Sequence, residues 1–327
     1  MELSRIKGVA AAAAFVVTAS LAVAPGWTAN ADTTKPTAKT TPPASAWRPI
    51  FADVEVRNRQ QHLVVGRLGR VGARHIIFNF AQGPSSGGVG TIAVSHSGKR
   101  VAFNYADRGD WVIAVIDADG RGYRVLSHAF TEQLVWSADD RRIFFDRNYH
   151  GVERIWRVPA DGSARPKRIA NSERAVPTAA ASNGRWLALW SSRGGPAFGR
   201  CAIIRVNGAG RRNVGPDNCE SPLWRPHAST LATSRFIRSN SHSLLTQQIW
   251  VLYLRSGRYR AIPHVQSAGR DGIATPLAWD RGGAFLYYEH CGNHSCRYYR
   301  IRPDGTGKRD LTAQFPPTKW LVTLQPG

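Results

Sequence analysis

Two stretches of the sequence share one pattern: residues 94–126, VSHSGKRVAFNYADRGDWVIAVIDADGRGYRVL, and residues 136–169, WSADDRRIFFDRNYHGVERIWRVPADGSARPKRI. Each contains a polar turn, an apolar run, a loop, a second apolar run and a turn that ends in Ala-Asp-Gly. Asp, Asn, Ser and Gly gather in such turns because they tolerate a tight or left-handed backbone. Apolar runs between such turns are typical of short β-strands. The pattern therefore predicts a module of short antiparallel strands.

This module recurs along the chain at a nearly constant spacing. The glycines that close the second turn of each copy are Gly120, Gly162, Gly210, Gly257 and Gly305, at intervals of 42, 48, 47 and 48 residues. Four short strands fit that length, and repeats of this size are typical of β-propeller blades. We therefore expect an all-β chain that forms a single β-propeller.

The number of blades follows from the length of the repeating region. Residues 50–327 hold about six repeats of roughly 46 residues each. The sixth blade would combine both ends of the chain, with an inner strand at Trp320–Leu324 and outer strands within Ala52–Phe80, at Leu63–Arg67 and Arg74–Phe78. Such pairing of the N- and C-terminal segments leaves no open sheet edge. We predict six four-stranded blades, and counts of five or seven also fit because the N-terminal segment matches the module poorly.

The repeat resembles that of a known family. A Trp or small residue, Ser-x-Asp/Ser-Gly, an apolar strand, an Ile-Trp-like strand and Ala-Asp-Gly are similar to the repeat of TolB-like propellers, over about residues 90–315. The resemblance implies the propeller architecture and a scaffold role in binding. TolB itself carries a separate α/β domain before its propeller, whereas only a short tether stands there in this sequence, so the resemblance does not carry over the partner. Trp136, Trp224 and Trp279 share one repeat position and are expected to fill the seams between blades.

The N-terminal residues have the pattern of an export signal. Arg5 and Lys7 precede an apolar run from Val9 to Ala24, and Ala29-Asn30-Ala31 supplies small residues at a cleavage site. We predict a signal peptide at residues 1–31, a disordered Thr/Pro/Ala-rich tether at 32–46 and the propeller at 47–327. The protein is then secreted or associated with the cell envelope, without a transmembrane segment in the mature chain.

Four cysteines follow the predicted signal, and an exported chain should oxidise them. Of the three pairings, we favour Cys291 with Cys296, across a short loop, and Cys201 with Cys219. A competing interpretation is a zinc site formed by Cys291, His294 and Cys296 with His290. The close spacing would give a tetrahedral ion a cramped geometry, so we expect no metal and no cofactor.

The chain is strongly basic, with a formal net charge of +22, and 37 of its 44 basic residues are arginine. Such a surface attracts polyanions, which include acidic wall polymers, anionic membranes and nucleic acid. A coding bias toward arginine is an equally good explanation, because the arginines lie beside turns on every blade and form no single stripe. The sequence leaves both explanations open.

Propeller geometry separates the loops into two ends. Connections between second and third strands and between blades open at one end, here called the long-loop end, and the two Gly turns of each repeat open at the other, the short-turn end. Long irregular loops on a rigid scaffold are where binding residues concentrate. Guanidinium groups beside aromatic rings suit sugars, peptides and anionic polymers. The candidate binding residues at the long-loop end are Arg108, Arg147, Tyr149, His150, Arg193, Phe198, Arg200, Arg238, His242 and His290.

These observations predict an exported, non-catalytic propeller scaffold that binds an envelope protein or an acidic wall polymer, with nucleic acid not expected and a monomeric state. The alternative is a metal-dependent polysaccharide lyase or another glycan-active propeller enzyme, since oligogalacturonate lyases with similar repeats bind metal in a propeller. Four histidines would have to converge for that chemistry: His128, His150, His242 and His290. The loop carboxylates available for acid/base chemistry are Glu132, Glu153, Glu173, Asp217, Glu220 and Asp271.

Overall fold

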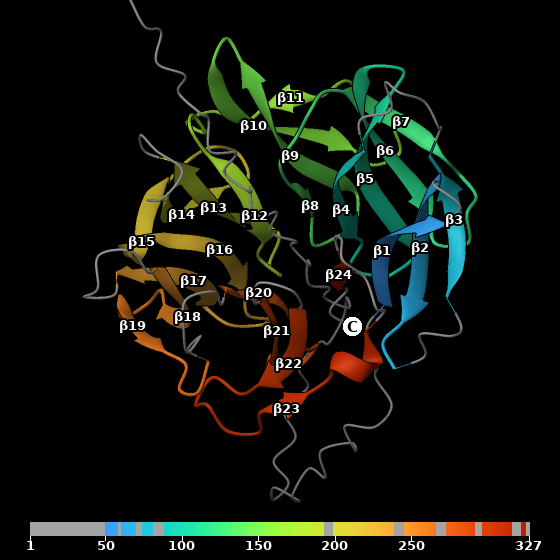
Figure 1. Ribbon diagram of the computed structural model, residues 1–327. Coiled ribbons are helices and arrows are strands. Elements are labelled where there is room, and N and C mark those ends of the chain that lie inside the picture. The colour runs from blue at the N-terminus through green and yellow to red at the C-terminus, as the bar shows by residue number, and fades with distance from the viewer. Residues whose placement is uncertain are drawn as a thin grey trace, which may run out of the picture.

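The computed structural model describes residues 50–57, 60–69, 74–80, 88–192, 199–238, 245–265, 273–291, 296–315 and 322–324. These residues form six four-stranded antiparallel sheets arranged around a central axis (Figure 1). The chain is therefore an all-β, six-bladed propeller, as predicted. A short 3-10 helix, η2 (Thr312–Gln314), follows the fifth blade. No helix among the described residues is long and apolar enough to cross a membrane.

Blades 1 to 5 are each built from four consecutive strands. The inner strands are β4 (Val89–Val94), β8 (Leu134–Trp136), β12 (Val176–Ala180), β16 (Cys219–Trp224) and β20 (Ile273–Trp279). The second strands are β5 (Arg100–Asp107), β9 (Arg142–Tyr149), β13 (Trp186–Ser192), β17 (Thr230–Arg238) and β21 (Leu286–Cys291). The third strands are β6 (Asp110–Asp117), β10 (Val152–Pro159), β14 (Gly199–Arg205), β18 (Leu245–Tyr253) and β22 (Cys296–Ile301). The outer strands are β7 (Arg124–His128), β11 (Lys167–Arg168), β15 (Arg212–Asp217), β19 (Arg258–Ala261) and β23 (Arg309–Asp310).

Blade 6 joins the two ends of the chain. Its strand order is β24-β1-β2-β3, with β24 (Val322–Leu324) innermost, then β1 (Ile50–Arg57), β2 (Gln60–Arg67) and β3 (His75–Asn79). Phe51 of β1 pairs with Leu324 of β24, and both side chains are fully buried. The predicted closure is confirmed, and the counts of five and seven blades are excluded.

The first turn of each repeat has the same hydrogen bonds. In blade 1, Ser95 N donates to Arg100 O at 2.8 Å and Gly98 N donates to Ser95 O at 2.9 Å. Gly98 has φ +69°, in the left-handed region that glycine enters without strain. Asp140 takes the corresponding place in blade 2 with φ +56°, because Asp also tolerates this conformation.

The tryptophans at the end of three inner strands fill the seams between blades. Trp136, Trp224 and Trp279 are 0%, 5% and 1% exposed. Trp136 Nε1 donates to Ala93 O of the preceding blade at 2.9 Å. A large ring in each seam buries apolar surface between neighbouring sheets, which holds the blades together.

Both predicted disulfides are present. Cys201 in β14 bonds Cys219, the first residue of β16, so blade 3 is linked covalently to blade 4. Cys291, the last residue of β21, bonds Cys296, the first of β22. Both cysteine sulfurs of the competing zinc site are engaged in this bond, and its His294 lies outside the described residues.

Candidate functional site

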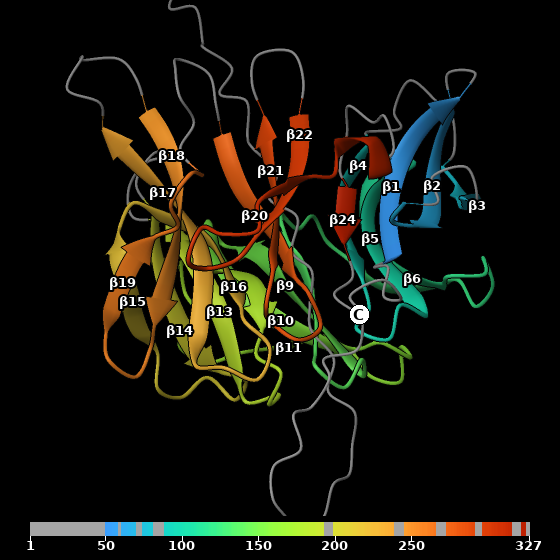
Figure 2. The ribbon, with the colours of Figure 1, turned by 90° about the horizontal axis from the view of Figure 1, so that it is seen from below.

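The candidate binding residues fall at different places in the blades. Arg108 lies in the turn between β5 and β6, Arg147 and Tyr149 close β9, His150 lies in the turn that follows, Arg200 is in β14, Arg238 ends β17 and His290 is in β21. Arg193, Phe198 and His242 lie outside the described residues. The end of β17 and the start of β18 lie on the same side of the ring as the end of β21 and the start of β22, at the top of Figure 2.

Two of these residues are already engaged within their own blades. Arg200 Nε lies 2.9 Å from Asp217 Oδ1 in an ion pair with the neighbouring strand. Burial, with Lys308 and Arg297 nearby, lowers the pKa of His290, which keeps its ring neutral at neutral pH. Neither side chain offers a free charge to an anionic partner.

The structure brings Arg147 and Tyr149 together with residues of β10. The Arg147 guanidinium lies 5.7 Å from the centre of the Trp156 ring, and that of Arg154 lies 6.0 Å from the Tyr149 ring. The rings of Tyr149 and Trp156 are 6.3 Å apart, and the His150 ring is 4.2 Å from that of Tyr149. We call Arg147, Trp156, Tyr149 and Arg154 the Arg-aromatic ladder.

The register of the β9–β10 hairpin explains the ladder. Arg154 pairs directly with Arg147, so the two guanidinium groups share one face of the sheet. Each guanidinium group reaches diagonally to an aromatic ring on the opposite strand. The face of the ring attracts the cation, which offsets the repulsion between the two guanidinium groups. Glu173 Oε1 lies 3.8 Å from Arg154 Nε at the outer edge. Two guanidinium groups, of which that of Arg154 is paired with Glu173, and two rings are thereby fixed on one surface.

Blade 1 contributes two further rings to the same seam. Trp111 pairs with Ala106, on the face of blade 1 that packs toward blade 2, and its ring is 4.8 Å from Phe130. Gly90 gives this ring its space, since a Cβ there would lie 3.1 Å from Trp111. Phe130 is 43% exposed and Tyr149 is 43% exposed. Together with the ladder, Trp111 and Phe130 form what we call the blade 1–2 surface.

Two buried polar residues hold the segment that carries Phe130. Asn104 Nδ2 donates to Ala129 O at 2.9 Å. Asp146 accepts hydrogen bonds from Thr131 Oγ1 at 2.8 Å, and from the backbone N of Glu132 and Gln133. Burial raises the pKa of Asp146 to about 6, although these bonds favour its carboxylate. The segment between β7 and β8 is thus anchored on both sides.

Carboxyl groups with raised pKa values lie near the same end. Burial raises the pKa of Glu132 to about 7, with a further contribution from Asp146 and Glu153. Burial alone raises the pKa of Glu220 and of Glu289 to about 7. Glu132 and Glu220 were candidates from the sequence, whereas Glu289, in β21, was not among them. Alignment of the repeats could have identified Glu289. Asn104, Asp146 and Glu289 occupy the same position in the second strands of their blades.

The histidines do not gather among the described residues. His128 ends β7, His150 lies in the β9–β10 turn, and His290 is in β21, three different blades. Within the described ranges, one group of His, Cys, Asp or Glu has the spacing of metal ligands, namely Glu289 with Cys291 and Cys296. Its two sulfurs form a disulfide, so it cannot serve as a ligand set.

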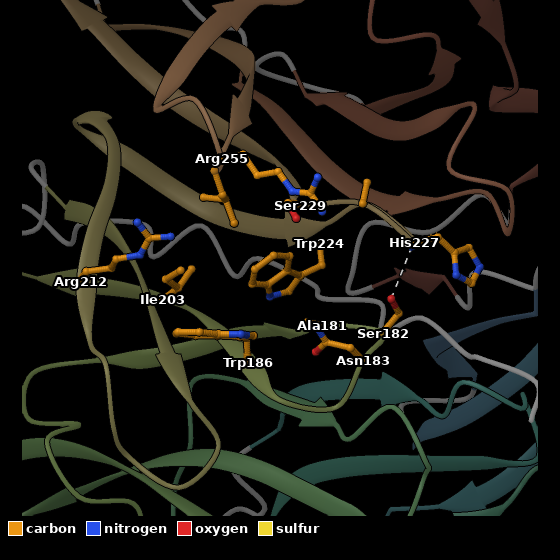
Figure 3. Close-up of a pocket in the computed structure, with 12 residues that line it drawn as sticks. Ala181, Ser182, Asn183, Trp186, Ile203, Arg212, Trp224, His227, Ser229 and Arg255 are labelled. Carbon is orange, nitrogen blue, oxygen red and sulfur yellow. Dashed lines mark hydrogen bonds between the residues drawn. The ribbon is translucent and has the colours of Figure 1, made fainter.

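The short-turn end, where no binding residues were predicted, contains two cavities. One of about 760 Å³ lies between blades 6 and 1, lined by Ile50, Arg67 and Asp119 among others. The other, of about 740 Å³, lies between blades 3 and 4 and is lined by Trp186, Trp224, His227 and two arginines (Figure 3). The lengths of the loops predicted binding at the long-loop end. Loop length does not indicate where a cavity forms between two neighbouring sheets.

Comparison with known proteins gives matches in structure. No protein-family model matches the chain, and neither does any curated protein sequence. TolB from Acinetobacter baumannii is similar with a TM-score of 0.61 and 12% identity, over 85% of this chain and 65% of that one. A putative TolB from Agrobacterium tumefaciens has a TM-score of 0.57 and 11% identity, over 86% of this chain and 92% of that one. An oligogalacturonate lyase in complex with manganese has a TM-score of 0.51 and 13% identity, over 80% and 72%.

Identities this low establish the fold and carry no activity over to the chain. The chain spans 65% of the length of the Acinetobacter TolB, so that protein's whole role is not transferable either. The blade number, the strand order and the structural matches all indicate the same fold. The described residues of this chain form a six-bladed β-propeller, and its fold is similar to that of the two TolB structures.

Proposed function

We propose that the protein is an exported, non-catalytic propeller scaffold that binds an acidic cell-envelope polymer at its long-loop end, through the blade 1–2 surface. The observation that carries the proposal is the Arg-aromatic ladder, in which guanidinium groups alternate with rings. Guanidinium groups bind carboxylates, and aromatic faces pack against the flat faces of sugar rings. A polymer of acidic sugars offers both features at each unit.

Two further features support a role outside the cytoplasm. The two disulfides are typical of oxidising compartments. The high positive charge of the chain would concentrate anionic polymers near its surface before specific contacts form. An envelope protein that presents carboxylates is the alternative partner, and the experiment below includes it as an outcome.

Binding of the protein to immobilised polygalacturonate tests the proposal. Arg147→Ala should weaken binding about tenfold, because a charge-assisted contact is lost. The control is Arg141→Ala, which removes the same charge at the short-turn end and should have little effect. Tyr149→Ala should weaken binding, whereas Tyr259→Ala should not, although Tyr259 is 45% exposed and also packs against a tryptophan, Trp250.

The outcomes separate the alternatives. Equal losses for Arg147→Ala and Arg141→Ala would contradict a specific surface and leave only general charge attraction. If polygalacturonate does not bind, but an envelope extract yields a protein that Arg147→Ala fails to retain, the partner is a protein. Shortening of the polymer with formation of unsaturated ends would show a lyase and overturn the non-catalytic assignment.

A further inference from the structure

The cavity between blades 3 and 4 has the size and lining of a small-molecule site. Its volume of about 740 Å³ falls within the range of ligand pockets, roughly 300–1,000 Å³. Figure 3 shows Trp224 at the centre of the lining residues, between Trp186 on one side and Arg255 on the other. The turn that carries His227 closes one side.

The other tryptophan seams show what usually fills this space. Between blades 1 and 2 the Arg100 guanidinium lies 5.0 Å from the Trp136 ring and also donates to Asp140 O. Between blades 4 and 5 the Arg225 guanidinium lies 5.5 Å from the Trp279 ring, and its Nε donates to Gly283 O at 2.7 Å. In both seams an arginine of the preceding blade covers the tryptophan and reaches the next turn.

Blade 3 has no arginine at either corresponding position. Ala181 N donates to Trp186 O, the bond that Ser95 N makes to Arg100 O in blade 1 and Arg225 N makes to Thr230 O in blade 4. Trp186 therefore stands where blade 1 has Arg100, and Ala181 stands where blade 4 has Arg225. The cavity arises at this seam because a small residue and a ring replace the covering arginine.

Trp224 forms part of the cavity wall, with its indole nitrogen buried. Its side chain is 5% exposed, and its Nε1 has no hydrogen-bond partner among the described residues. The corresponding Trp136 Nε1 donates to Ala93 O at 2.9 Å. Trp279 Nε1, in a seam without this cavity, also has no partner among the described residues, so the indole ring of Trp224, and not its nitrogen, is what the cavity offers to a ligand.

The charge of the lining favours an anion. Arg212 and Arg255 are both exposed beside the cavity, and no Asp or Glu is among its described lining residues. The Arg205 guanidinium lies 5.2 Å from the Trp186 ring and adds positive charge on that side. A cationic ligand would meet like charges without a carboxylate partner, whereas two indole rings offer flat apolar surfaces for a ring.

We propose that the cavity between blades 3 and 4 is a binding site for a small anionic ligand that carries a flat apolar ring, with Trp186 and Trp224 contacting the ring and Arg255 and Arg212 pairing with its acidic group. The site is separate from the blade 1–2 surface and lies at the opposite end of the propeller. It therefore does not depend on the proposed polymer binding.

Calorimetric titration of the protein with naphthalene sulfonate tests this site, with naphthalene methanol and naphthyl methylammonium as the neutral and cationic counterparts. We expect saturable one-to-one binding of the sulfonate, about tenfold weaker binding of the neutral compound and no binding of the cation. Arg255→Ala should weaken sulfonate binding about tenfold. Arg281→Ala, at an exposed turn of blade 5 outside the lining, should leave it unchanged.

A second pair of variants tests the contact with the large indole ring. Trp224→Phe should weaken sulfonate binding, and Trp279→Phe, at the same repeat position in a seam without this cavity, should not. The unfolding temperature of each tryptophan variant shows whether it is still folded. If Trp224→Phe is not folded, the binding result for Arg255→Ala tests the proposal instead. Absence of saturable sulfonate binding, equal weakening by Arg255→Ala and Arg281→Ala, or tighter binding of the cation would each overturn the proposal.

Discussion

Glu132 gives the blade 1–2 surface a titratable charge. Its pKa is raised to about 7, mainly by burial and then by Asp146 and Glu153, of which Glu153 directly precedes Arg154 of the ladder. Above that pH the ionised carboxyl adds negative charge at this end of the propeller and repels an anionic polymer. As the pH falls through about 7 the carboxyl is protonated, while the carboxylates of a uronic acid polymer stay ionised.

Affinity for polygalacturonate should therefore rise about two- to fivefold between pH 8 and pH 6. Glu132→Gln should flatten this dependence and give at pH 8 the affinity that the unchanged protein has at pH 6. Glu220→Gln is the control, because Glu220 has the same repeat position and a pKa also raised to about 7, but lies in blade 4. Equal flattening by both variants would show that the titrating group is elsewhere.

At the same scale, the candidate site could be predicted only in part. Arg147, Tyr149 and His150 are close in the sequence and were predicted to lie in one loop, whereas the structure places Arg147 and Tyr149 in β9 and only His150 in the turn that follows. Arg154 and Trp156 could not be assigned to them, because the pairing register of β9 and β10 decides which side chains share a face. Phe130 depends on bonds to Asn104 and Asp146 that no spacing indicates.

The strand β24 is the element on which closure of the ring depends. Its three residues pair with Phe51, Ala52 and Asp53 of β1, and Leu324 is fully buried. Without β24 the inner edge of β1 would expose unpaired backbone groups beside an apolar core, a template for association with other chains.

Deletion of residues 320–327 should lower the unfolding temperature and promote aggregation, measured by thermal melting and light scattering. Deletion of residues 325–327 alone is the matched control and should behave like the full chain, since it leaves β24 intact. Equal melting temperatures and no aggregation in either variant would show that the ring does not need this strand.

The cavity between blades 3 and 4 illustrates why some features of an element escape the sequence. Each repeat was recognised by what it shares with the others, namely its turns and its apolar strands. The cavity arises from what blade 3 lacks, an arginine over the tryptophan of the next blade. A missing side chain becomes visible only when the strands are aligned by their hydrogen bonds.

For the whole molecule, the repeat spacing was sufficient to predict the architecture. Periodic turns determine blade length, and blade length with chain length favours six blades. The pairing of β24 with β1 then excludes five and seven. The N-terminal segment, which matches the repeat poorly, still forms β1, β2 and β3, because pairing with β24 and packing against blade 1 compensate for weak local signals. Tertiary contacts of this kind cannot be read from a local pattern.

The compartment is also a property of the whole chain. If residues 1–31 are a cleaved signal, the protein recovered from its native envelope should begin at Asp32, as intact-mass and N-terminal peptide measurements would show. Its four cysteines should resist alkylation until a reductant is added. An intact Met1 with freely alkylated cysteines would place the protein in a reducing compartment and remove the basis for an envelope partner.

The union of β24 with β1 also governs the order of events during synthesis. Strands β1 to β3 leave the ribosome first, yet their inner neighbour is among the last residues to emerge. The native ring therefore cannot close before β24 has emerged, and a chain that stops before residue 322 leaves the inner edge of β1 unpaired. If the protein is exported, as proposed, the late pairing of β24 with β1 would leave blade 6 incomplete until the segment with residues 322–324 has followed the other strands across the membrane.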